Sequence, residues 1–369
     1  MTWTCLAVTA ALVTGLAGQS PAADLYRRED IRVPLPGAGV HSLEALLVRS
    51  SEPGRYPLAL ITHGSPRSPS DRPNMSPLAM LPQAIEFARH GWVAVVLMRR
   101  GYGGSGGGWA EDHGPCADPR YIAAGTAAAA DLKAAIASLG SRPDIDTSRV
   151  ISAGVSAGGF ATVALAADAP PGLAAAINFA GGRGSPHDNE VCREDRLVEA
   201  YRFFGKRARI PMLWVYAEND HFFGLQLAEQ FKQAFAEGGA NVEFIRAAAF
   251  GSDGHRLFSQ AGIPVWGGLV DAFLKRQGLV MRATPLPPLP RPALAAPTAL
   301  SANGRSAFET YLMSPPHKAF ALSRDGHFGW QSGQRTTELA SGGALKFCRQ
   351  SAKTCEVAFV NDASILKSN

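Results

Sequence analysis

A serine between two glycines offers the clearest chemistry in this sequence. The segment 154–158 reads Gly-Val-Ser-Ala-Gly, with Ser156 at its centre. Residues 149–153 favour a short buried strand before it, and residues 159–166 favour a helix after it. At such a corner the serine hydroxyl projects above the sheet, and the glycines let neighbouring backbone pass without a Cβ clash. Ser156 is therefore a predicted nucleophile, with a simple glycine-rich turn as the alternative.

A serine nucleophile requires two partners. Because its hydroxyl reacts poorly at neutral pH, a base must take its proton and an acid must orient that base. The expected chain order is serine, then an acid after a late strand, then a histidine after the next strand. Asp220 is the predicted acid, with Glu218 as the alternative. His255, in a glycine-rich loop, is the predicted base, with His221 as its competitor.

Two backbone N–H groups are expected to bind the oxyanion that forms during attack on a carbonyl. Ala157 follows the serine at the positive end of a helix. Ser65 lies in the loop after an early strand, in the run Thr-His-Gly-Ser-Pro, and the next residue, Pro66, has no N–H to donate. His63 in the same loop is interpreted as a structural histidine rather than a second base.

Alternating elements must position these residues. Strands are expected over residues 41–48, 58–62, 92–98, 149–153, 173–179, 212–216 and 242–246, and helices over 77–90, 121–139, 159–166, 224–237 and 265–275. This alternation predicts an α/β fold with a mostly parallel, doubly wound sheet. The pattern breaks between residues 181 and 209, which predicts an insertion over the carboxyl edge of the sheet. That insertion, Tyr102 and Trp109 are the candidate substrate-binding residues.

These residues together resemble the α/β-hydrolase superfamily, and within it the dienelactone hydrolases and prolyl-oligopeptidase-like serine hydrolases. The motifs that carry the resemblance are 63–65, 100–105, 154–158, Asp220 and His255. The resemblance covers about residues 31–278 and implies an α/β-hydrolase fold, an acyl-enzyme mechanism and no metal or organic cofactor. Dienelactone hydrolases proper carry a cysteine nucleophile, so Ser156 favours a general esterase or peptidase over a lactone-specific enzyme.

The favoured function is an exported hydrolase that cleaves a carboxylic ester through Ser156, His255 and Asp220. Its substrates are expected to be small-molecule esters or peptides. A peptidase or acyltransferase with the same triad is the first alternative, and a secreted binding protein on a hydrolase scaffold is the second. The formal net charge of +5 comes without any run of five basic residues, so no nucleic-acid partner is expected.

The N-terminus resembles a secretory signal peptide. Residues 6–16 are apolar and uncharged, small residues follow, and the first charge is Asp24. The apolar run is too short to span a membrane. The sequence therefore predicts removal of about residues 1–23 and a secreted or periplasmic location.

Four cysteines remain after such a cleavage, namely Cys116, Cys192, Cys348 and Cys355. An even number in an oxidising compartment suggests disulfides, for which three pairings exist. The simplest joins Cys348 to its near neighbour Cys355 and Cys116 to Cys192. None lies in a Cys-x-x-Cys pattern, so no zinc site is expected.

The expected organisation is a signal peptide over 1–23, a catalytic domain over 24–280, a Pro-rich linker over 281–303 and a small C-terminal module over 304–369. Six prolines among residues 283–297 favour a stiff, extended segment. A hairpin over 318–330, a helix over 336–350 and a strand over 355–360 predict an α+β module that a disulfide would stabilise. Either a docking role or a role as a stabilising flap fits these residues.

Overall fold

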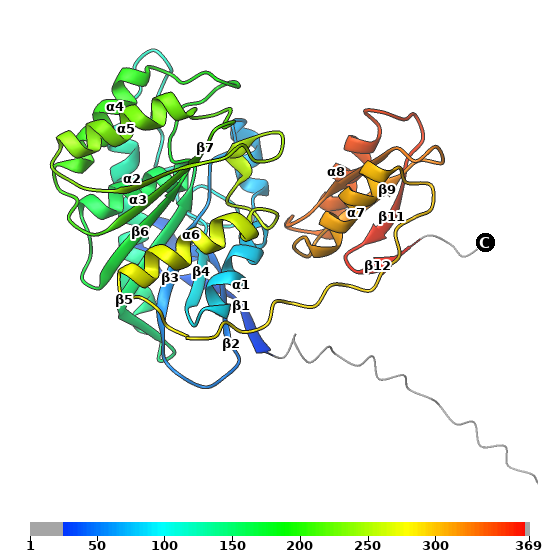
Figure 1. Ribbon diagram of the computed structural model, residues 1–369, viewed down its shortest axis with the longest axis horizontal. Coiled ribbons are helices and arrows are strands. Elements are labelled where there is room, and N and C mark those ends of the chain that lie inside the picture. The colour runs from blue at the N-terminus through cyan, green and yellow to red at the C-terminus, as the bar shows by residue number, and fades with distance from the viewer. Residues whose placement is uncertain (1–24, 366–369) are drawn as a thin grey trace, which may run out of the picture.

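An eight-stranded sheet forms the centre of the larger part of the molecule in the computed structural model, which describes residues 25–365 (Figure 1). The predicted signal peptide lies outside the described residues. The strand order is β1-β2-β4-β3-β5-β6-β7-β8. The pairs β1–β2 and β2–β4 are antiparallel, and every other pair is parallel, which confirms the predicted mostly parallel sheet. The strands are β1 (Tyr26–Val33), β2 (Leu43–Ser50), β3 (Tyr56–Thr62), β4 (Val93–Leu97), β5 (Ile145–Val155), β6 (Leu173–Phe179), β7 (Met212–Ala217) and β8 (Glu243–Ala247).

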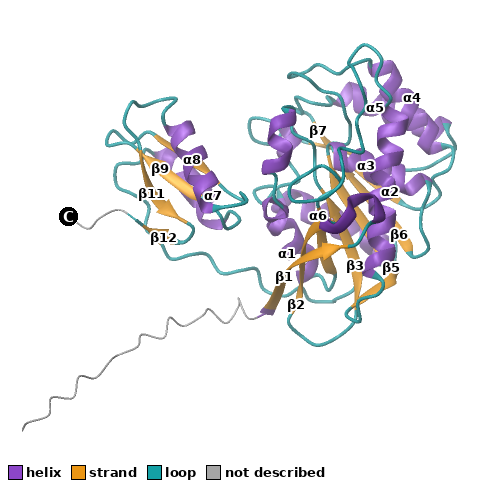
Figure 2. Ribbon diagram, turned by 180° about the vertical axis from the view of Figure 1, so that it is seen from behind, coloured by secondary structure: helices purple, strands orange, loops and turns teal. Residues whose placement is uncertain are grey.

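Helices cover both faces of this sheet (Figure 2). Side chains alternate between the faces along each strand, so a strand buried on both sides is apolar throughout. In β3, Leu58 and Leu60 join one core, whereas Ala59 and Ile61 join the other. The first core includes residues of α2 (Tyr121–Leu139), α3 (Ala157–Ala167), α4 (Glu194–Gly205) and α5 (Leu225–Glu237); the second includes residues of α1 (Leu81–Arg89) and α6 (Ile263–Arg276).

Helix α2 is the one helix among the described residues that is long and apolar enough to cross a membrane. Half of its apolar window is buried inside the structure. Leu132 and Ile136 belong to the first core, and Asp131 pairs with Arg100 at 2.6 Å. Packing against the sheet therefore accounts for its apolar composition, and no integral membrane span is indicated.

Two regions of the larger part of the molecule differ from the sequence-based expectations. The helix expected over 77–90 begins as the 3-10 turn η4 (Pro77–Met80), and α1 starts only at Leu81. Pro82 lies in the first turn of α1, where its missing N–H costs no helical hydrogen bond. The insertion over 181–209 contains α4, where the sequence pattern predicts no regular element.

A second, antiparallel sheet of four strands forms the C-terminal module, in the order β10-β9-β11-β12. Its elements are α7 (Ala302–Met313), β9 (Ala319–Leu322), β10 (Phe328–Gln331), α8 (Thr337–Cys348), β11 (Glu356–Val360) and β12 (Ala363–Ser364). The predicted hairpin forms as β9 and β10, and Gly326 in its turn has a φ of +80°. Phe308, Phe320 and Phe359 form the centre of the module core. A disulfide joins Cys348 to Cys355, with Cα atoms 6.2 Å apart.

The proline-rich segment between the two parts has no helix or strand from 283 to 296, and both of its ends pack against folded structure. Leu286 donates its N–H to the Arg89 carbonyl at 3.0 Å, and Arg89 Nε donates to the Leu286 carbonyl at 2.7 Å. Leu289 packs against the second core, whereas Leu294 and Ala296 pack against the module core. The segment is thus anchored on both sides.

Candidate active site

Ser156 occupies the sharp corner between β5 and α3. Its backbone has φ 57° and ψ −125°, a combination that a non-glycine residue adopts only under strain. A Cβ on Gly154 would collide with the carbonyl oxygen of Gly158, and one on Gly158 would collide with that of Thr62. The two flanking glycines are therefore required by the close approach of backbone at this corner.

Asp220 and His255 lie side by side at the same edge of the sheet. His255, in the 3-10 turn η5 (Gly254–Arg256), places Nδ1 3.0 Å from Asp220 Oδ2. The Asp220 side chain is fully buried, and its Oδ1 also accepts the N–H groups of Phe222 and Phe223 at 2.7 and 2.9 Å. The Phe222 ring stacks on the imidazole with centroids 4.0 Å apart. These contacts fix the orientation of the imidazole ring.

The alternative acid and base lie elsewhere. Glu218 is exposed to solvent, and its backbone N–H donates to the Ala247 carbonyl at 3.0 Å. His221 turns its Nδ1 toward Asn189 Oδ1 at 3.2 Å. The structure thus brings Asp220, rather than Glu218, to His255.

Parallel strands bring Ser156, Asp220 and His255 to a common edge, because the three residues follow the carboxyl ends of β5, β7 and β8. The Phe223 ring lies 5.8 Å from the His255 ring, and Phe223 lines the cavity that Ser156 also lines. No hydrogen bond joins the Ser156 hydroxyl to His255 in the described part of the chain. Such contacts commonly tighten only when substrate binds.

Ser65 and Ala157 are the predicted oxyanion donors. Both line the same cavity as Ser156. Within residues 25–365, neither N–H group donates a backbone hydrogen bond. A Cβ on Gly64 would lie 3.1 Å from the Ser156 Cβ, so the loop that carries Ser65 packs directly against the serine.

His63 is buried with both ring nitrogens engaged. Its Nδ1 lies 2.6 Å from the Gly64 carbonyl oxygen, and its Nε2 accepts the Arg99 N–H at 3.2 Å. Burial, together with the nearby positive charge of Arg99, lowers the pKa of His63 to about 3. A neutral imidazole in this position holds the loop between Thr62 and Ser65.

A buried ionic cluster behind this loop was not predicted from the sequence. Glu111 lies between two guanidinium groups, those of Arg99 at 3.0 Å and Arg183 at 2.9 Å. Burial by itself would raise the pKa of Glu111, but the charges of Arg183 and Arg99 outweigh burial and hold it well below its usual range. Arg99 also donates to the His63 carbonyl at 2.8 Å and to the Thr62 hydroxyl. The cluster therefore supports the loop over residues 62–65.

The cavity beside Ser156 has a volume of about 190 Å³. Its lining includes three arginines, Arg67, Arg72 and Arg183, and no acidic residue. Within the described residues no group of three or more His, Cys, Asp or Glu side chains is arranged to hold a metal ion. The lining of the cavity offers hydroxyl, imidazole, backbone N–H and guanidinium groups.

The three arginines differ in how far their charges are already neutralised. Arg67 pairs with Asp188 at 2.7 Å and lies over the Phe222 ring. Arg183 shares Glu111 with Arg99. Arg72 lies over the Trp109 ring at 3.7 Å, and no acidic side chain pairs with it in the described part of the chain. Arg72 Nη1 and Arg183 Nε are buried without hydrogen-bond partners among the described residues.

Of the two predicted substrate-binding side chains, Trp109 lines the cavity and Tyr102 does not. Tyr102 is completely buried. Its hydroxyl donates to Ser65 Oγ at 2.9 Å and accepts the Trp109 Nε1–H at 3.0 Å. Tyr102 lies behind the lining and positions Ser65 and Trp109, so its assignment as a direct substrate contact is corrected to a supporting one.

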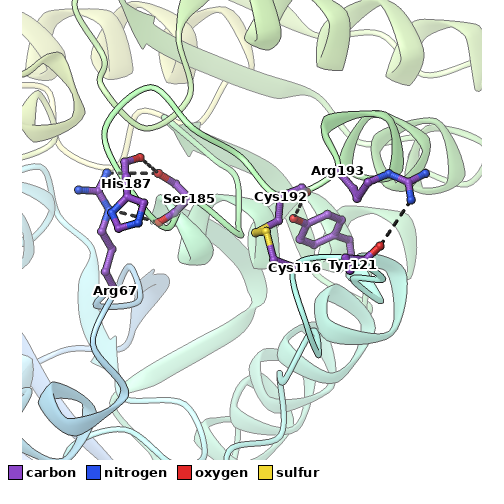
Figure 3. The surroundings of a disulfide bond; sticks show 8 residues. Arg67, Cys116, Tyr121, Ser185, His187, Cys192 and Arg193 are labelled. Atoms are coloured by element: carbon purple, nitrogen blue, oxygen red, sulfur yellow. Dashed lines mark hydrogen bonds between the residues drawn. A yellow bond between two sulfur atoms is a disulfide. The ribbon is translucent and has the colours of Figure 1, made fainter.

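Part of the predicted insertion lines the cavity, namely residues 182–186 and Cys192. A disulfide joins Cys192 to Cys116, with Cα atoms 4.9 Å apart, and Arg67 Nε donates to the Ser185 carbonyl at 3.2 Å (Figure 3). Together with the bridge in the C-terminal module, this is the pairing that the sequence analysis favoured.

Residues 83–255, which include Ser156, Asp220 and His255, match the model of the dienelactone hydrolase family. Similar solved structures include a putative dienelactone hydrolase from Klebsiella pneumoniae subsp. pneumoniae MGH 78578, at 16% identity over 68% of this chain and 99% of that chain, with a TM-score of 0.46. Others are the Pyrococcus furiosus esterase Pf2001 (14%, 70% and 94%, 0.48) and the Pyrococcus horikoshii acylaminoacyl peptidase (18%, 69% and 42%, 0.47). No curated protein matches. The family match confirms the resemblance to dienelactone hydrolases and supports an enzyme of the hydrolase class.

Proposed function

We propose that this chain, whose residues 83–255 match the dienelactone hydrolase family, is an exported serine hydrolase that cleaves a carboxylic ester. The observation that supports this most directly is the 3.0 Å contact between Asp220 and His255, at the sheet edge where Ser156 projects from its strained corner into a cavity. The chain order of these residues, serine, then acid, then histidine, is the order expected for acyl transfer in this fold, and it supports their roles as nucleophile, orienting acid and base.

The reaction proceeds through an acyl-enzyme. Ser156 Oγ attacks the ester carbonyl carbon while His255 Nε2 takes the hydroxyl proton, and Asp220 holds the Nδ1–H side of the ring. The N–H groups of Ser65 and Ala157 bind the oxyanion. Collapse of the tetrahedral intermediate breaks the bond to the leaving alcohol, which receives the proton from His255. Water, deprotonated by His255, then releases the acid and restores Ser156.

The charge of the cavity supports a substrate that carries a negative group close to its ester. Three guanidinium groups line the cavity, and that of Arg72 has no acidic partner among the described residues. Burying a charge is costly unless it is paired, so an anionic substrate group would supply the acidic partner that Arg72 lacks among the described residues. Trp109 and Phe222 hold Arg72 and Arg67 by stacking, which limits the ordering cost on binding.

Export forms part of the proposal. Disulfides such as Cys116–Cys192 and Cys348–Cys355 persist in oxidising compartments, and the pattern of residues 1–23 is typical of a signal peptide. The exported chain is expected to begin at Ala23 or Asp24.

Labelling with a fluorophosphonate probe tests the proposal. Wild-type protein is expected to label, and Ser156→Ala is expected not to. If wild-type protein fails to label, or the variant labels equally well, the chain is not a serine hydrolase acting through Ser156, and the alternative of a binding protein on a hydrolase scaffold gains support. A panel of p-nitrophenyl esters and aminoacyl nitroanilides then separates an esterase from a peptidase. Comparable kcat/KM for both sets would favour the peptidase.

A further inference from the structure

One loop of the C-terminal module reaches the catalytic part of the molecule. Between β10 and α8, Arg335 Nη1 donates to Glu44 Oε2 at 2.8 Å and to the Met75 carbonyl at 3.1 Å. Gly333 in the same loop has a φ of +64°, and a Cβ there would lie 2.6 Å from the Cα of Ala79. The loop therefore contacts the catalytic part through both backbone and side chain.

Three segments contact one another at the Glu44 carboxylate, namely β2, the loop after β4 and the loop between β10 and α8. Glu44 lies in β2, and its Oε2 accepts the N–H of Gly104 at 2.6 Å as well as Arg335. The neighbouring Gly103 donates its N–H to the Arg72 carbonyl at 2.9 Å. A Cβ on Gly103 would lie 2.6 Å from Glu44 Oε2 and 3.2 Å from Arg335 Nη1. The loop after β4 is thus packed tightly against the ion pair.

The turn that carries Arg72 and the loop after β4 also form one wall of the cavity beside Ser156. Arg72, in the 3-10 turn η3 (Pro69–Asn74), directs its guanidinium over Trp109 in the lining. Tyr102, in the loop after β4, donates to Ser65 Oγ at 2.9 Å. Arg335 therefore contacts this wall without lining the cavity, whereas Arg72 and Ser65 line the cavity itself.

We propose that the C-terminal module braces the substrate-binding wall and that Arg335 is a positioning residue, which acts through Glu44 and Met75 on the placement of Arg72. This inference rests on the proposed function. Without Arg335 the carboxylate of Glu44, only 17% exposed, loses this ion-pair partner, and the Met75 carbonyl loses its hydrogen bond to Arg335. The hydrogen bond from Gly103 to the Arg72 carbonyl and the stacking of Arg72 on Trp109 remain, so Arg72 is held less precisely relative to Ser156 but is not released.

Steady-state kinetics with two p-nitrophenyl esters, one with a carboxylate on the acyl chain and one neutral and of equal length, tests the proposal. Arg335→Met is expected to raise KM for the anionic ester roughly tenfold, with kcat nearly unchanged, since misplacement of a binding group by a fraction of an ångström has effects of this order. Arg335→Lys is expected to recover most of the affinity, because one ammonium donates to both acceptors. KM for the neutral ester should change little.

Arg324→Met is the matched control. Arg324 is exposed on the β9–β10 turn of the same module, so its loss removes the same charge without touching the brace. Indistinguishable KM values for Arg324→Met and Arg335→Met would overturn the proposal. An equal change of KM for both esters would also overturn it, because that result indicates general disruption.

A double-variant cycle separates the ion pair from folding effects. Glu44→Gln and Arg335→Met are each expected to raise KM for the anionic ester. The double variant is expected to be no worse than Arg335→Met, since both single variants remove the same ion pair and Arg335→Met also removes the hydrogen bond to Met75. Additive effects would contradict the brace. Failure of wild-type protein to label at Ser156 would instead defeat the proposed function, so the two failures are distinguishable.

Discussion

Two histidines at the carboxyl edge of the sheet differ in surroundings. His255 has one nitrogen beside Asp220, and the other makes no hydrogen bond within the described chain. His63 has both nitrogens engaged, by Gly64 and Arg99. A base must exchange its proton with the substrate, which only the first arrangement permits. His63 instead behaves as a fixed neutral hydrogen-bonding group.

This neutral state makes stability depend on pH. The pKa of His63 is about 3 in the folded protein against 6.5 when unfolded, so between these values the unfolded chain binds more protons. Stability attributable to His63 is therefore intact above pH 6.5 and falls as the pH decreases toward 3. From pH 7 to pH 5 the loss is about 2 kcal/mol. Urea denaturation should show this decrease in wild-type protein, and His63→Gln should lack this part of it. Equal pH slopes in both proteins would contradict the assignment.

Arg72 is expected to select the charge of the substrate. Replacing it with methionine removes a charge that has no acidic partner in the described chain, so KM for an anionic ester should rise roughly ten- to a hundredfold. Arg67→Met should have a smaller effect, because Asp188 already neutralises Arg67. The pair of esters used above provides the measurement, and a larger effect for Arg67→Met would argue against this role.

The sequence predicted the residues that carry a local pattern and missed those that depend on distant contacts. The serine corner and the order of acid and base are visible because each follows a strand. The cluster of Glu111 with Arg99 and Arg183 joins positions up to 84 apart, and each of these residues alone is typical of a solvated surface. Pairing of such groups is decided by the fold, which brings the loops together.

At the scale of elements, the corner between β5 and α3 depends on Gly158. An alanine there would place its Cβ against the carbonyl oxygens of Thr62 and His63, so we expect a loss of stability on the order of 3 kcal/mol and slow labelling of Ser156. Gly268→Ala is the control: no atom lies within 4 Å of the added Cβ in α6, and a gain of about 0.5–1 kcal/mol is expected. Urea denaturation measures both variants, and a tolerated Gly158→Ala would show that the corner relaxes freely.

Elements with a strong local sequence pattern were the easiest to predict. The expected strand 173–179 matches β6, and the expected helix 121–139 matches α2, because both are continuously apolar or alanine-rich. Helix α4 was missed because it is amphipathic and highly charged. Leu197, Tyr201 and Phe204 bury one face of it in the core, whereas the charged residues on its other face were taken as a sign of irregular chain.

At the scale of the whole molecule, the linker decides where the chain can be shortened. A chain ending at 297 keeps the Leu286–Arg89 pair and Leu289, so we expect it to fold and to label at Ser156. It should share the raised KM of Arg335→Met. A chain ending at 281 loses these contacts and the Arg282–Glu52 ion pair, and should melt at a lower temperature. Thermal denaturation and labelling check both, and loss of labelling in the longer chain would show that the module completes the catalytic fold.

The anchored linker also means that the brace works through effective concentration. A single ion pair with side chains 30% and 17% exposed contributes too little to hold two separate proteins together. A short tether replaces that weak association with an intramolecular one, equivalent to a concentration on the order of millimolar. A proteolytic cut between Leu289 and Leu294 would change no side chain, but it would let the module dissociate and so remove the Arg335 contacts from the wall. Adding the free module back would restore affinity for the anionic ester only as the module concentration approached that value.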